Sequence, residues 1–395
     1  MQDAVIVAGG RAPVARGRVG GTYYFDKPEA ISAQVLKGVL KQLGPRFSPV
    51  EIDDVIVGCA MPENIQGSNI ARRLTLEAGL PVSVPAQTIN RYCASGIEAL
   101  ALADLKVKSG QANLVVAGGL EFQSTTPYAS LEATASLPLE EAGVGLSTWM
   151  GITAENLAEA YEISRQAQDE FSVGSHHKAA KNRAALEGET IPVEAHTGEG
   201  DDTHWVTHDE GIRPDTSLAQ VAKLPAVFKK GGTVTAASSS QISDGTGFIV
   251  VMSRDLAKQW GLKPLGRLLD YQVVGCDPDM MGIGPVPATQ KVLQNTGLTL
   301  DDMGVIELNE AFAAQSLAVC QALDLDPKRI NPRGGAIALG HPNGATGAIL
   351  SWRLLDEMKQ KQARYGLVTM CIGGGMGAAG IFERCCEEET GNGNL

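Results

Sequence analysis

The sequence predicts an α/β fold built from two similar halves, with a long segment inserted into the first half. Apolar runs typical of buried strands alternate with helical patterns at both ends of the chain, which favours a parallel sheet covered on both faces. This alternation stops at about residue 122 and returns after residue 242. Motifs of the first half also recur about 250 residues later, as LVVAGG does in LVTMCIGGG. Such a repeat is typical of a duplicated unit with a site where its copies meet.

Composition restricts the partners and the compartment. The 395 residues carry a net charge of −12, which argues against nucleic acid as a partner. The seven cysteines lie mostly in apolar runs without metal-ligand spacing to histidine, so we expect free thiols, a reducing compartment and no metal. We find neither a signal peptide nor an apolar run of membrane-spanning length, and the expected location is the cytoplasm.

The first half begins with a strand at Ala4–Ala8, which ends at two glycines. An amphipathic helix at Pro28–Leu43 follows, with Asp26 as its expected cap and Gly44 as its stop. The remaining elements are a strand at Asp54–Gly58, a helix at Asn69–Ala78, an extended segment at Val84–Asn90, a helix at Ala94–Lys108 and a strand at Leu114–Ala117.

The inserted segment, residues 122–241, has a different texture. A polar, irregular stretch precedes two predicted helices, Thr153–Glu162 and Ser164–Leu186, and Ser164 is a good cap for the second. Its cationic residues make it the expected place for phosphates, although most of them are expected on solvated faces: Arg165, Lys178, Lys181, Arg183, Arg213, Lys223, Lys229 and Lys230. Five histidines lie in this segment and are expected to be exposed: His176, His177, His196, His204 and His208.

The second half restores the alternation of strands and helices. The predicted elements are strands at Phe248–Met252, Leu265–Val274 and Val305–Leu308, helices at Asp255–Trp260 and Val286–Thr296, a helix after His341, a strand ending at Cys371 and a final strand. The GGGMG run precedes this final strand instead of opening a helix, which excludes a dinucleotide-binding loop.

A candidate nucleophile, Cys93, lies where an extended segment gives way to a helix. Unpaired N–H groups and the helix dipole at such a position favour an anion, so we expect a thiol with a depressed pKa. The alternative interpretation is a buried structural cysteine, which is the usual fate of a free thiol.

Three more segments of the repeat fall at strand ends or in the turns that follow, the edge where open α/β sheets bind ligands. They contain Asn309, His341 and Cys371. His341 is the one histidine in a glycine-rich turn between core elements, and a cysteine nucleophile needs a base within hydrogen-bond reach. Cys371 precedes glycines whose N–H groups can point at an oxyanion.

Together these segments resemble the thiolase family over nearly the whole chain. The motifs are NRYCASG, MGITAENLA, TVTAASSSQISDG, MGIGPVPA, ELNEAFAAQ, GGAIALGHPNGATG and CIGGGMGAAG. The resemblance implies two βαβαβαββ halves that form a five-layered α-β-α-β-α core with an inserted loop domain. The domains expected are an N-terminal half at 1–121, completed by 242–263, a loop domain at 122–241 that binds coenzyme A, and a C-terminal half at 264–395.

The resemblance also implies roles for site residues. Cys93 is the nucleophile that becomes acylated, and His341 takes its proton. His341 and a water held by Asn309 form one oxyanion hole, while the N–H groups of Cys93 and Gly373 form a second. Cys371 is the acid/base toward the acetyl-CoA carbanion and coenzyme A. Coenzyme A is a substrate, with no tightly bound cofactor, and its contacts are Arg213, Gln220, Lys223, Phe228, Ala236 and Ser240, with Met150 and Met281 lining the tunnel.

The implied activity is thiolytic cleavage of a 3-ketoacyl-CoA to acetyl-CoA and a shortened acyl-CoA through an acyl-cysteine, by ping-pong kinetics, as in fatty-acid β-oxidation. The NRYC form looks more like degradative than biosynthetic members. The chain departs from the family pattern at Trp149, Ala237-Ser238 and Asn343, which leaves open an acetoacetyl-CoA thiolase. A decarboxylating ketoacyl synthase and a non-catalytic subunit are further alternatives.

The resemblance implies a homodimer or homotetramer with residues 69–97 near the interface, and it leaves open a hydratase/dehydrogenase partner subunit.

Overall fold

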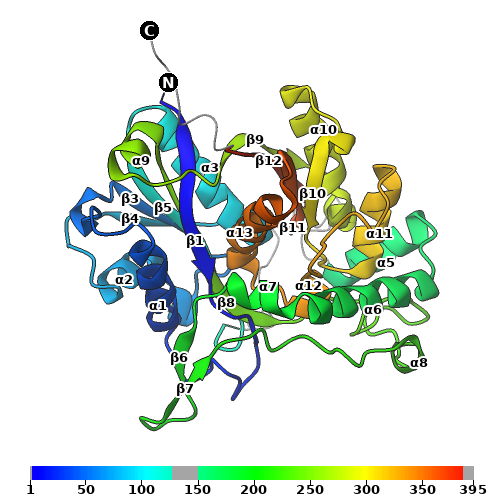
Figure 1. Ribbon diagram of the computed structural model, residues 1–395. Coiled ribbons are helices and arrows are strands. Elements are labelled where there is room, and N and C mark those ends of the chain that lie inside the picture. Colours follow the sequence, from blue (N-terminus) through cyan, green and yellow to red (C-terminus); the bar gives the residue numbers. More distant parts are fainter. Residues whose placement is uncertain (1, 127–149, 386–395) are drawn as a thin grey trace, which may run out of the picture.

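The computed structural model describes residues 2–126 and 150–385, in which ten strands form one sheet (Figure 1). The order along the sheet is β4-β3-β5-β8-β1-β9-β12-β11-β10, and β2 pairs with β8. The strands are β1 (Ala4–Arg11), β2 (Ala15–Arg16), β3 (Asp54–Gly58), β4 (Ala86–Ile89), β5 (Leu114–Phe122), β8 (Ser243–Ser253), β9 (Gly266–Gly275), β10 (Met303–Leu308), β11 (Tyr365–Ile372) and β12 (Met376–Arg384). The irregular stretch predicted before residue 150 falls mostly outside the described residues.

The two halves of the sheet repeat the same strand order, which confirms the duplication. In the first half β4, β3 and β5 are parallel, and β8 and β1 follow antiparallel. In the second half β10 and β11 are parallel, and β12 and β9 follow antiparallel. Ile330 bridges Ile306 in parallel, at the place that β4 takes in the first half. The half-sheets are joined where Ile6 pairs with Gly266.

Helices cover the sheet and separate its two halves. They are α1 (Pro28–Lys41), α2 (Ile70–Glu77), α3 (Ser95–Lys108), α5 (Met150–Ala160), α6 (Arg165–Lys181), α7 (Arg183–Gly188), α8 (Leu218–Val221), α9 (Arg254–Trp260), α10 (Pro285–Thr296), α11 (Ala313–Ala322), α12 (Ala336–Leu339) and α13 (Asn343–Lys361). The short 3₁₀ turns are η1 (Pro49–Glu51), η2 (Asn64–Gln66), η3 (Tyr92–Ala94), η5 (Pro278–Ile283) and η6 (Leu300–Asp302).

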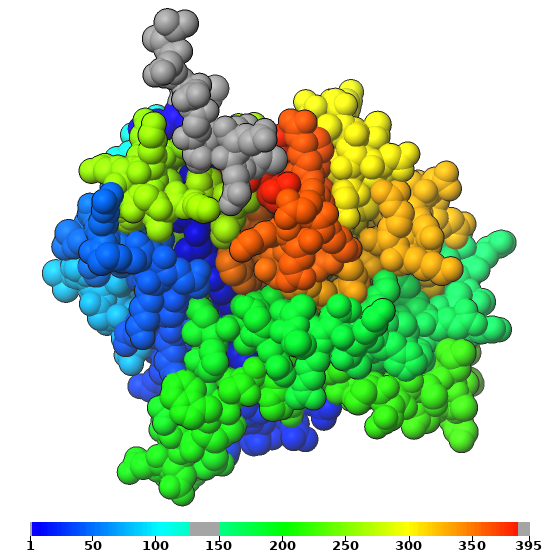
Figure 2. Space-filling view, viewed as in Figure 1, coloured from blue at the N-terminus to red at the C-terminus, as the bar shows by residue number. Residues whose placement is uncertain are grey.

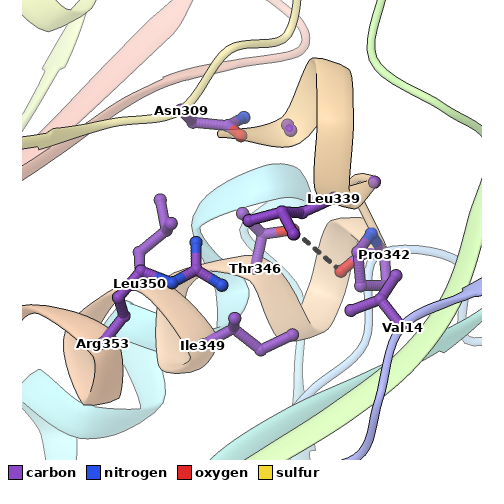
Figure 3. A pocket seen from close by; sticks show the side chains of 10 residues that line it. Val14, Asn309, Leu339, Pro342, Thr346, Ile349, Leu350 and Arg353 are labelled. Carbon is purple, nitrogen blue, oxygen red and sulfur yellow. Dashed lines mark hydrogen bonds between the residues drawn. The ribbon is translucent and has the colours of Figure 1, made fainter. Parts of the chain in front are cut away.

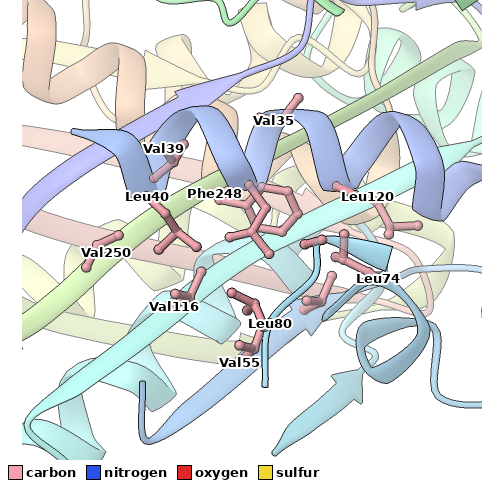
Figure 4. Packing of buried hydrophobic residues seen from close by; sticks show 14 of the residues in the cluster. Val35, Val39, Leu40, Val55, Leu74, Leu80, Val116, Leu120, Phe248 and Val250 are labelled. Atoms are coloured by element: carbon pink, nitrogen blue, oxygen red, sulfur yellow. The ribbon is translucent and has the colours of Figure 1, made fainter. Parts of the chain in front are cut away.

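Three apolar clusters define the five layers. The first packs α1, α2 and α9 on the outer face of the N-terminal half-sheet (Figure 4), and it takes Phe248 and Val250 from β8. The second surrounds α3 and α13 and takes the alternate β8 residues, Ile249 and Val251. The third packs α10 and α11 against the C-terminal half-sheet. Because side chains alternate along a strand, each half-sheet is buried on both faces.

The central helices α3 and α13 cross at equivalent glycines of the repeat. A Cβ on Gly96 would lie 2.6 Å from the backbone nitrogen of Ala348, and one on Gly347 would lie 2.4 Å from that of Ile97. Only glycine permits this close approach of the two backbones. Figure 1 shows α13 in the middle of the molecule. The N-termini of both helices are thereby fixed at the junction of the halves.

Local signals set most helix ends. Asn69 caps α2 by accepting from Arg72 N–H, and Ser164 caps α6 by accepting from Ala167 N–H, as predicted for Ser164. The prediction that Asp26 caps α1 is wrong. Asp26 accepts a hydrogen bond from the backbone N–H of His196, and its other oxygen bonds Nδ1 of the same histidine at 2.7 Å. Both carboxylate oxygens of Asp26 are therefore bonded to the inserted segment. The predicted helix at Ser164–Leu186 is divided into α6 and α7.

The inserted segment spreads across the lower face of both halves (Figure 2) and carries the hairpin β6 (Val193–His196) and β7 (Thr203–Val206). A buried ion cluster fastens it. Arg11 of β1 bonds Asp209 at 2.6 Å and Glu189 at 3.0 Å, and Glu189 also binds Arg333 and Arg353 of the second half. Among the described helices, none combines the length and apolar character needed to span a bilayer.

Candidate active site

A strained turn presents Cys93 at the start of α3. The turn η3 follows β4, and Tyr92 has a φ of +45°, which is uncommon for a non-glycine residue. Hydrogen bonds hold it in place. Tyr92 N–H donates to Asn90 Oδ1 at 2.8 Å, and Ser95 Oγ donates to Tyr92 O at 2.7 Å while accepting from Arg91 N–H. A strained residue held by this many contacts is typical of a functional turn.

The thiol of Cys93 is protonated at rest. Burial raises its pKa to about 11, although the N–H groups of Gly373 and of Cys93 itself lie where they favour the thiolate. The prediction of a depressed pKa is therefore wrong, because desolvation by the packed surroundings outweighs the N–H groups at the helix start. The nearby charge of Glu121 also raises this pKa. Consequently the nucleophile needs a base.

Cys371 lies beside Cys93. It is the penultimate residue of β11 and is fully buried, and burial together with the neighbouring Cys93 raises its pKa well above the ordinary value. The turn after β11 places Gly374 and Gly375 at φ +80°, a conformation that favours glycine. This turn brings the Gly373 N–H to the Cys93 sulfur, so the sequence correctly grouped these three residues.

His341 and Asn309 form the second part of the site. Asn309 follows β10, and its Nδ2 lies 3.3 Å from His341 Nε2. His341 Nδ1 lies 2.6 Å from Thr346 Oγ1, and burial lowers the pKa of His341 to about 4. The imidazole is therefore neutral near pH 7. Within the described residues no hydrogen bond joins His341 to Cys93. The turn η3 packs against α13, which begins two residues after His341, and against β11, which carries Cys371.

Glu121 is a site neighbour that sequence reasoning missed. It ends the apolar run LVVAGGL on β5 and is fully buried. Its carboxylate accepts from the N–H groups of Ala60 at 2.8 Å and Gly344 at 3.0 Å, and from Gln66 Nε2 at 2.8 Å. It thus ties the first turn of α13 to the end of β3. A lone acidic residue in a buried run is the signal that could have revealed it.

A pocket of about 540 Å³ opens in the inserted segment. Of the residues expected to contact coenzyme A, Arg213 and Gln220 line this pocket, and the lining does not include Lys223, Phe228, Ala236 and Ser240. Gln220 also accepts from Ser217 N–H at 2.9 Å, so part of its role is to cap α8. The lining that the sequence analysis did not assign to this pocket is Ser172, His176, Ile212, Pro214, Asp215, Thr216, Val221, Leu224 and Ala237.

His176 corrects the prediction that all five histidines of this segment are exposed. It is 4% exposed, burial lowers its pKa to about 4, and its Nδ1 accepts from Arg213 N–H at 3.2 Å. Several of the cations considered for phosphate binding instead form ion pairs or hydrogen bonds within the chain. Arg165 pairs with Asp169, Arg183 with Glu187 and Lys229 with Glu159, and Lys178 donates to Ile330 O.

The predicted tunnel residues lie with Cys371, away from the pocket lining. Met281 shares one apolar cluster with Cys371, and Met150 and Phe228 pack against it. Phe228 meets Phe312 edge to face at 5.9 Å. A Cβ on Gly373 would lie 3.7 Å from Met150 Sδ. These contacts place an apolar wall of the inserted segment next to the paired thiols.

Fold and site together define a class: duplicated α/β proteins that gather two thiols, an imidazole and a carboxamide where their halves meet. Sequence models of two domains match the chain, "Thiolase, N-terminal domain" at residues 4–255 and "Thiolase, C-terminal domain" at residues 262–384. The chain belongs to the thiolase family.

Individual relatives can be aligned with this chain over nearly its full length. The chain is 43% identical to a 3-ketoacyl-CoA thiolase of Bacillus subtilis (strain 168), over 98% of this chain and 100% of the relative. A 3-ketoacyl-CoA thiolase of Vibrio cholerae is also 43% identical, over 97% of this chain and 100% of the relative. The crystal structure of the Bacillus anthracis acetyl-CoA acetyltransferase matches with a TM-score of 0.88 at 36% identity, covering 98% of this chain and 99% of that one.

Proposed function

We propose that this thiolase-family enzyme cleaves 3-ketoacyl-CoA with coenzyme A, giving acetyl-CoA and a shortened acyl-CoA. The observation that carries the proposal is the pairing of Cys93 with Cys371, with the Gly373 N–H directed at the Cys93 sulfur. A reaction that forms an acyl-cysteine and releases an enolate needs both a nucleophile and a separate proton donor. The names of the relatives favour 3-ketoacyl substrates, and acetoacetyl-CoA is the runner-up because a structural relative is named acetyl-CoA acetyltransferase.

The proposed mechanism follows from the protonation states. Neutral His341 takes the proton of Cys93, whose sulfur attacks the 3-keto carbon. The bond between C2 and C3 then breaks, and Cys371 gives its proton to the acetyl-CoA enolate. The Cys371 thiolate next deprotonates coenzyme A, whose sulfur attacks the acyl-cysteine and expels the Cys93 thiolate. Cys93 then takes its proton back from His341. His341 with a water on Asn309, and the N–H groups of Cys93 and Gly373, stabilise the oxyanions, each donor contributing about 2.7–4 kcal/mol.

We propose that the pocket beside Arg213 binds the phosphates and nucleoside of coenzyme A, with Lys223, Ala236 and Ser240 at its margin. The wall formed by Phe228, Met150 and Met281 would line the path of the pantetheine to Cys371. This corresponds to a loop domain at 122–241 between halves at 1–121 with 242–263 and at 264–395. Coenzyme A is a substrate in this scheme, and no tightly bound cofactor takes part.

For quaternary structure we propose a homodimer, or a tetramer built from it, in the cytoplasm. β4 is an edge strand whose four residues are all partly exposed, and Val82 beside it is 81% exposed. An unpaired edge with an apolar neighbour favours pairing with a second copy. A monomer mass in solution, measured by light scattering on a fully active sample, would contradict this proposal.

The decisive experiment compares acetoacetyl-CoA with longer 3-ketoacyl-CoA substrates and maps the acylated peptide. We expect thiolysis of the longer chains and an acyl group on Cys93. An acyl group on Cys371 would reverse the roles of the two cysteines. Release of carbon dioxide from a malonyl thioester would instead indicate a decarboxylating synthase, and an inert protein would indicate a non-catalytic subunit.

A further inference from the structure

A small cavity lies behind the catalytic carboxamide (Figure 3). Its volume is about 10 Å³, the size that holds a single water molecule. The polar side chains in its lining are Asn309, Thr346 and Arg353. Asn309 is 1% exposed, and among the described residues its Oδ1 has no hydrogen-bond partner. A buried carboxamide oxygen at the edge of a water-sized cavity indicates a site for a hydrogen-bond donor.

One direction of donors and acceptors satisfies every contact around His341, including that of Thr346 Oγ1 with Pro342 O. Arg353 can only donate, and its Nε is already bonded to Glu189. The Asn309 oxygen accordingly faces the cavity that Arg353 also lines, where it offers an acceptor to a side chain that only donates. Asn309 Nδ2 then donates to His341 Nε2, which must carry a lone pair. His341 Nδ1 must carry the proton and donate it to Thr346 Oγ1, which donates in turn to Pro342 O at 3.0 Å.

We propose that one water in this cavity completes a directed hydrogen-bond chain from Arg353 to the Pro342 carbonyl. In this chain Arg353 and Thr346 are positioning residues that fix the tautomer of His341 with its basic nitrogen at Nε2. The water accepts from Arg353 and donates to Asn309 Oδ1. The proposal rests on the proposed function insofar as His341 is the base toward Cys93. In this chain α13 holds His341 on both sides. Thr346 in its first turn contacts Nδ1 directly, and Arg353 two turns later acts on Nε2 through the water and Asn309.

The protons can be observed directly by neutron diffraction from crystals of the full chain in heavy water. We expect a deuteron on His341 Nδ1, none on Nε2, the Asn309 amide nitrogen toward His341, and heavy water in the cavity. A deuteron on Nε2, a reversed Asn309 amide or a dry cavity would overturn the proposal. This result does not depend on turnover, so it is distinguishable from a failure of the proposed activity.

Kinetic variants test the same chain in solution. Thr346→Val keeps the shape but removes the acceptor of Nδ1–H, whereas Thr346→Ser keeps the hydroxyl. The matched control is Ser351→Ala, which removes another buried hydroxyl of α13 that bonds a carbonyl of its own helix at 2.7 Å.

We expect Thr346→Val to lower kcat by about tenfold to a hundredfold, part of the 10²–10⁴-fold that a positioned base contributes. The KM for coenzyme A should stay close to wild type, the acid limb of the pH profile should shift, and Thr346→Ser should restore most of the rate. If Thr346→Val behaves like Ser351→Ala, the hydroxyl does not position the base and the proposal fails.

Discussion

At the residue scale, the two thiols differ in their surroundings, which supports the distinct roles proposed for them. Cys93 is reached by two backbone N–H groups, whereas Cys371 is fully enclosed next to the apolar wall of the inserted segment. Both cysteines, His341 and Asn309 could be chosen as candidate site residues from the sequence, because each falls at a strand end or in a glycine-rich turn. The sequence did not reveal the high pKa of Cys93, because desolvation depends on atoms brought in from segments far apart in the chain.

The two half-reactions should respond differently to replacement of the thiols. A serine hydroxyl is a far poorer acid than a thiol, so Cys371→Ser should lower carbon–carbon cleavage by about 10²–10⁴-fold and acylation of Cys93 by less. Cys93→Ser should abolish both steps. Thiolysis of a 3-ketoacyl-CoA is measured beside acyl transfer to the enzyme. Near-normal thiolysis by Cys371→Ser would make that cysteine structural.

Arg213 offers a test of the pocket in the inserted segment. It lines the pocket but lies in a different part of the structure from the paired thiols, so Arg213→Ala should raise the KM for coenzyme A and leave kcat largely unchanged. Arg183→Ala is the control, since Arg183 belongs to the same segment but pairs with Glu187 on the surface. A collapsed kcat with an unchanged KM would exclude a phosphate site at Arg213.

At the element scale, the strands and helices follow closely from periodicity and glycine positions, and the errors come from contacts between segments far apart in the chain. The α1 cap was misassigned because Asp26 is recruited by His196, about 170 residues away. The buried state of His176 could not be predicted from a polar sequence, because the packing partners of α6 include α12 and α11 from the second half.

The crossing of α3 and α13 predicts a large penalty for a single methyl group. Gly347→Ala should destabilise the protein by about 1–3 kcal/mol, since the added Cβ would overlap the Ile97 backbone. Gly174→Ala in α6 is the control. A Cβ there meets no atom within 4 Å, so alanine should stabilise the helix by roughly 1 kcal/mol. Urea unfolding of both variants measures the difference, and equal effects would contradict the close approach.

At the scale of the whole molecule, the ion cluster around Glu189 joins both halves to the inserted segment. Sequence reasoning did not foresee it, since Arg11, Glu189, Arg333 and Arg353 lie far apart in the chain and acquire meaning only when folded. Breaking a buried ion pair leaves an unpaired charge, so Glu189→Gln should cost about 3–5 kcal/mol of unfolding free energy. Surface-exposed Glu187→Gln, two residues away, should cost less than about 1 kcal/mol. The measurement is denaturant unfolding of both variants. Equal midpoints for Glu189→Gln and Glu187→Gln would show that the cluster contributes little to stability.

Glu307 beside this cluster should give stability a distinctive pH dependence. Both oxygens of Glu307 are buried without hydrogen-bond partners in the described structure. Burial raises the pKa of Glu307 to about 8. The charges of Glu189 and Glu357 add to this shift, and those of Arg353 and Arg333 oppose it. The folded state thus retains a proton that the unfolded chain loses near pH 4.5. The stability that protonated Glu307 contributes is complete below pH 4.5 and is lost as the pH rises through 8.

Glu307→Gln removes this titration. The wild-type unfolding free energy should fall between pH 6.5 and 8.5, and the variant should fall less. Glu121 and Asp244, with pKa values of about 6, contribute little to the slope in this window. His341 is neutral when folded and binds a proton near pH 6.5 only in the unfolded chain, so it adds a rise in stability that the wild-type protein and the variant share. Parallel curves from thermal or urea unfolding would show that Glu307 is already ionised at pH 6.5.

The starts of the two central helices carry a last consequence. The thiol of Cys93 precedes α3 in one copy of the repeat, and the imidazole of His341 precedes α13 in the other. A nascent or proteolysed chain with one copy folded therefore holds the Cys93 thiol without the His341 imidazole, or the imidazole without the thiol. Under the proposed mechanism, such a fragment lacks one of the two groups that acyl transfer needs. During refolding, the return of turnover should lag the return of helical circular dichroism and mark the moment when the copies dock.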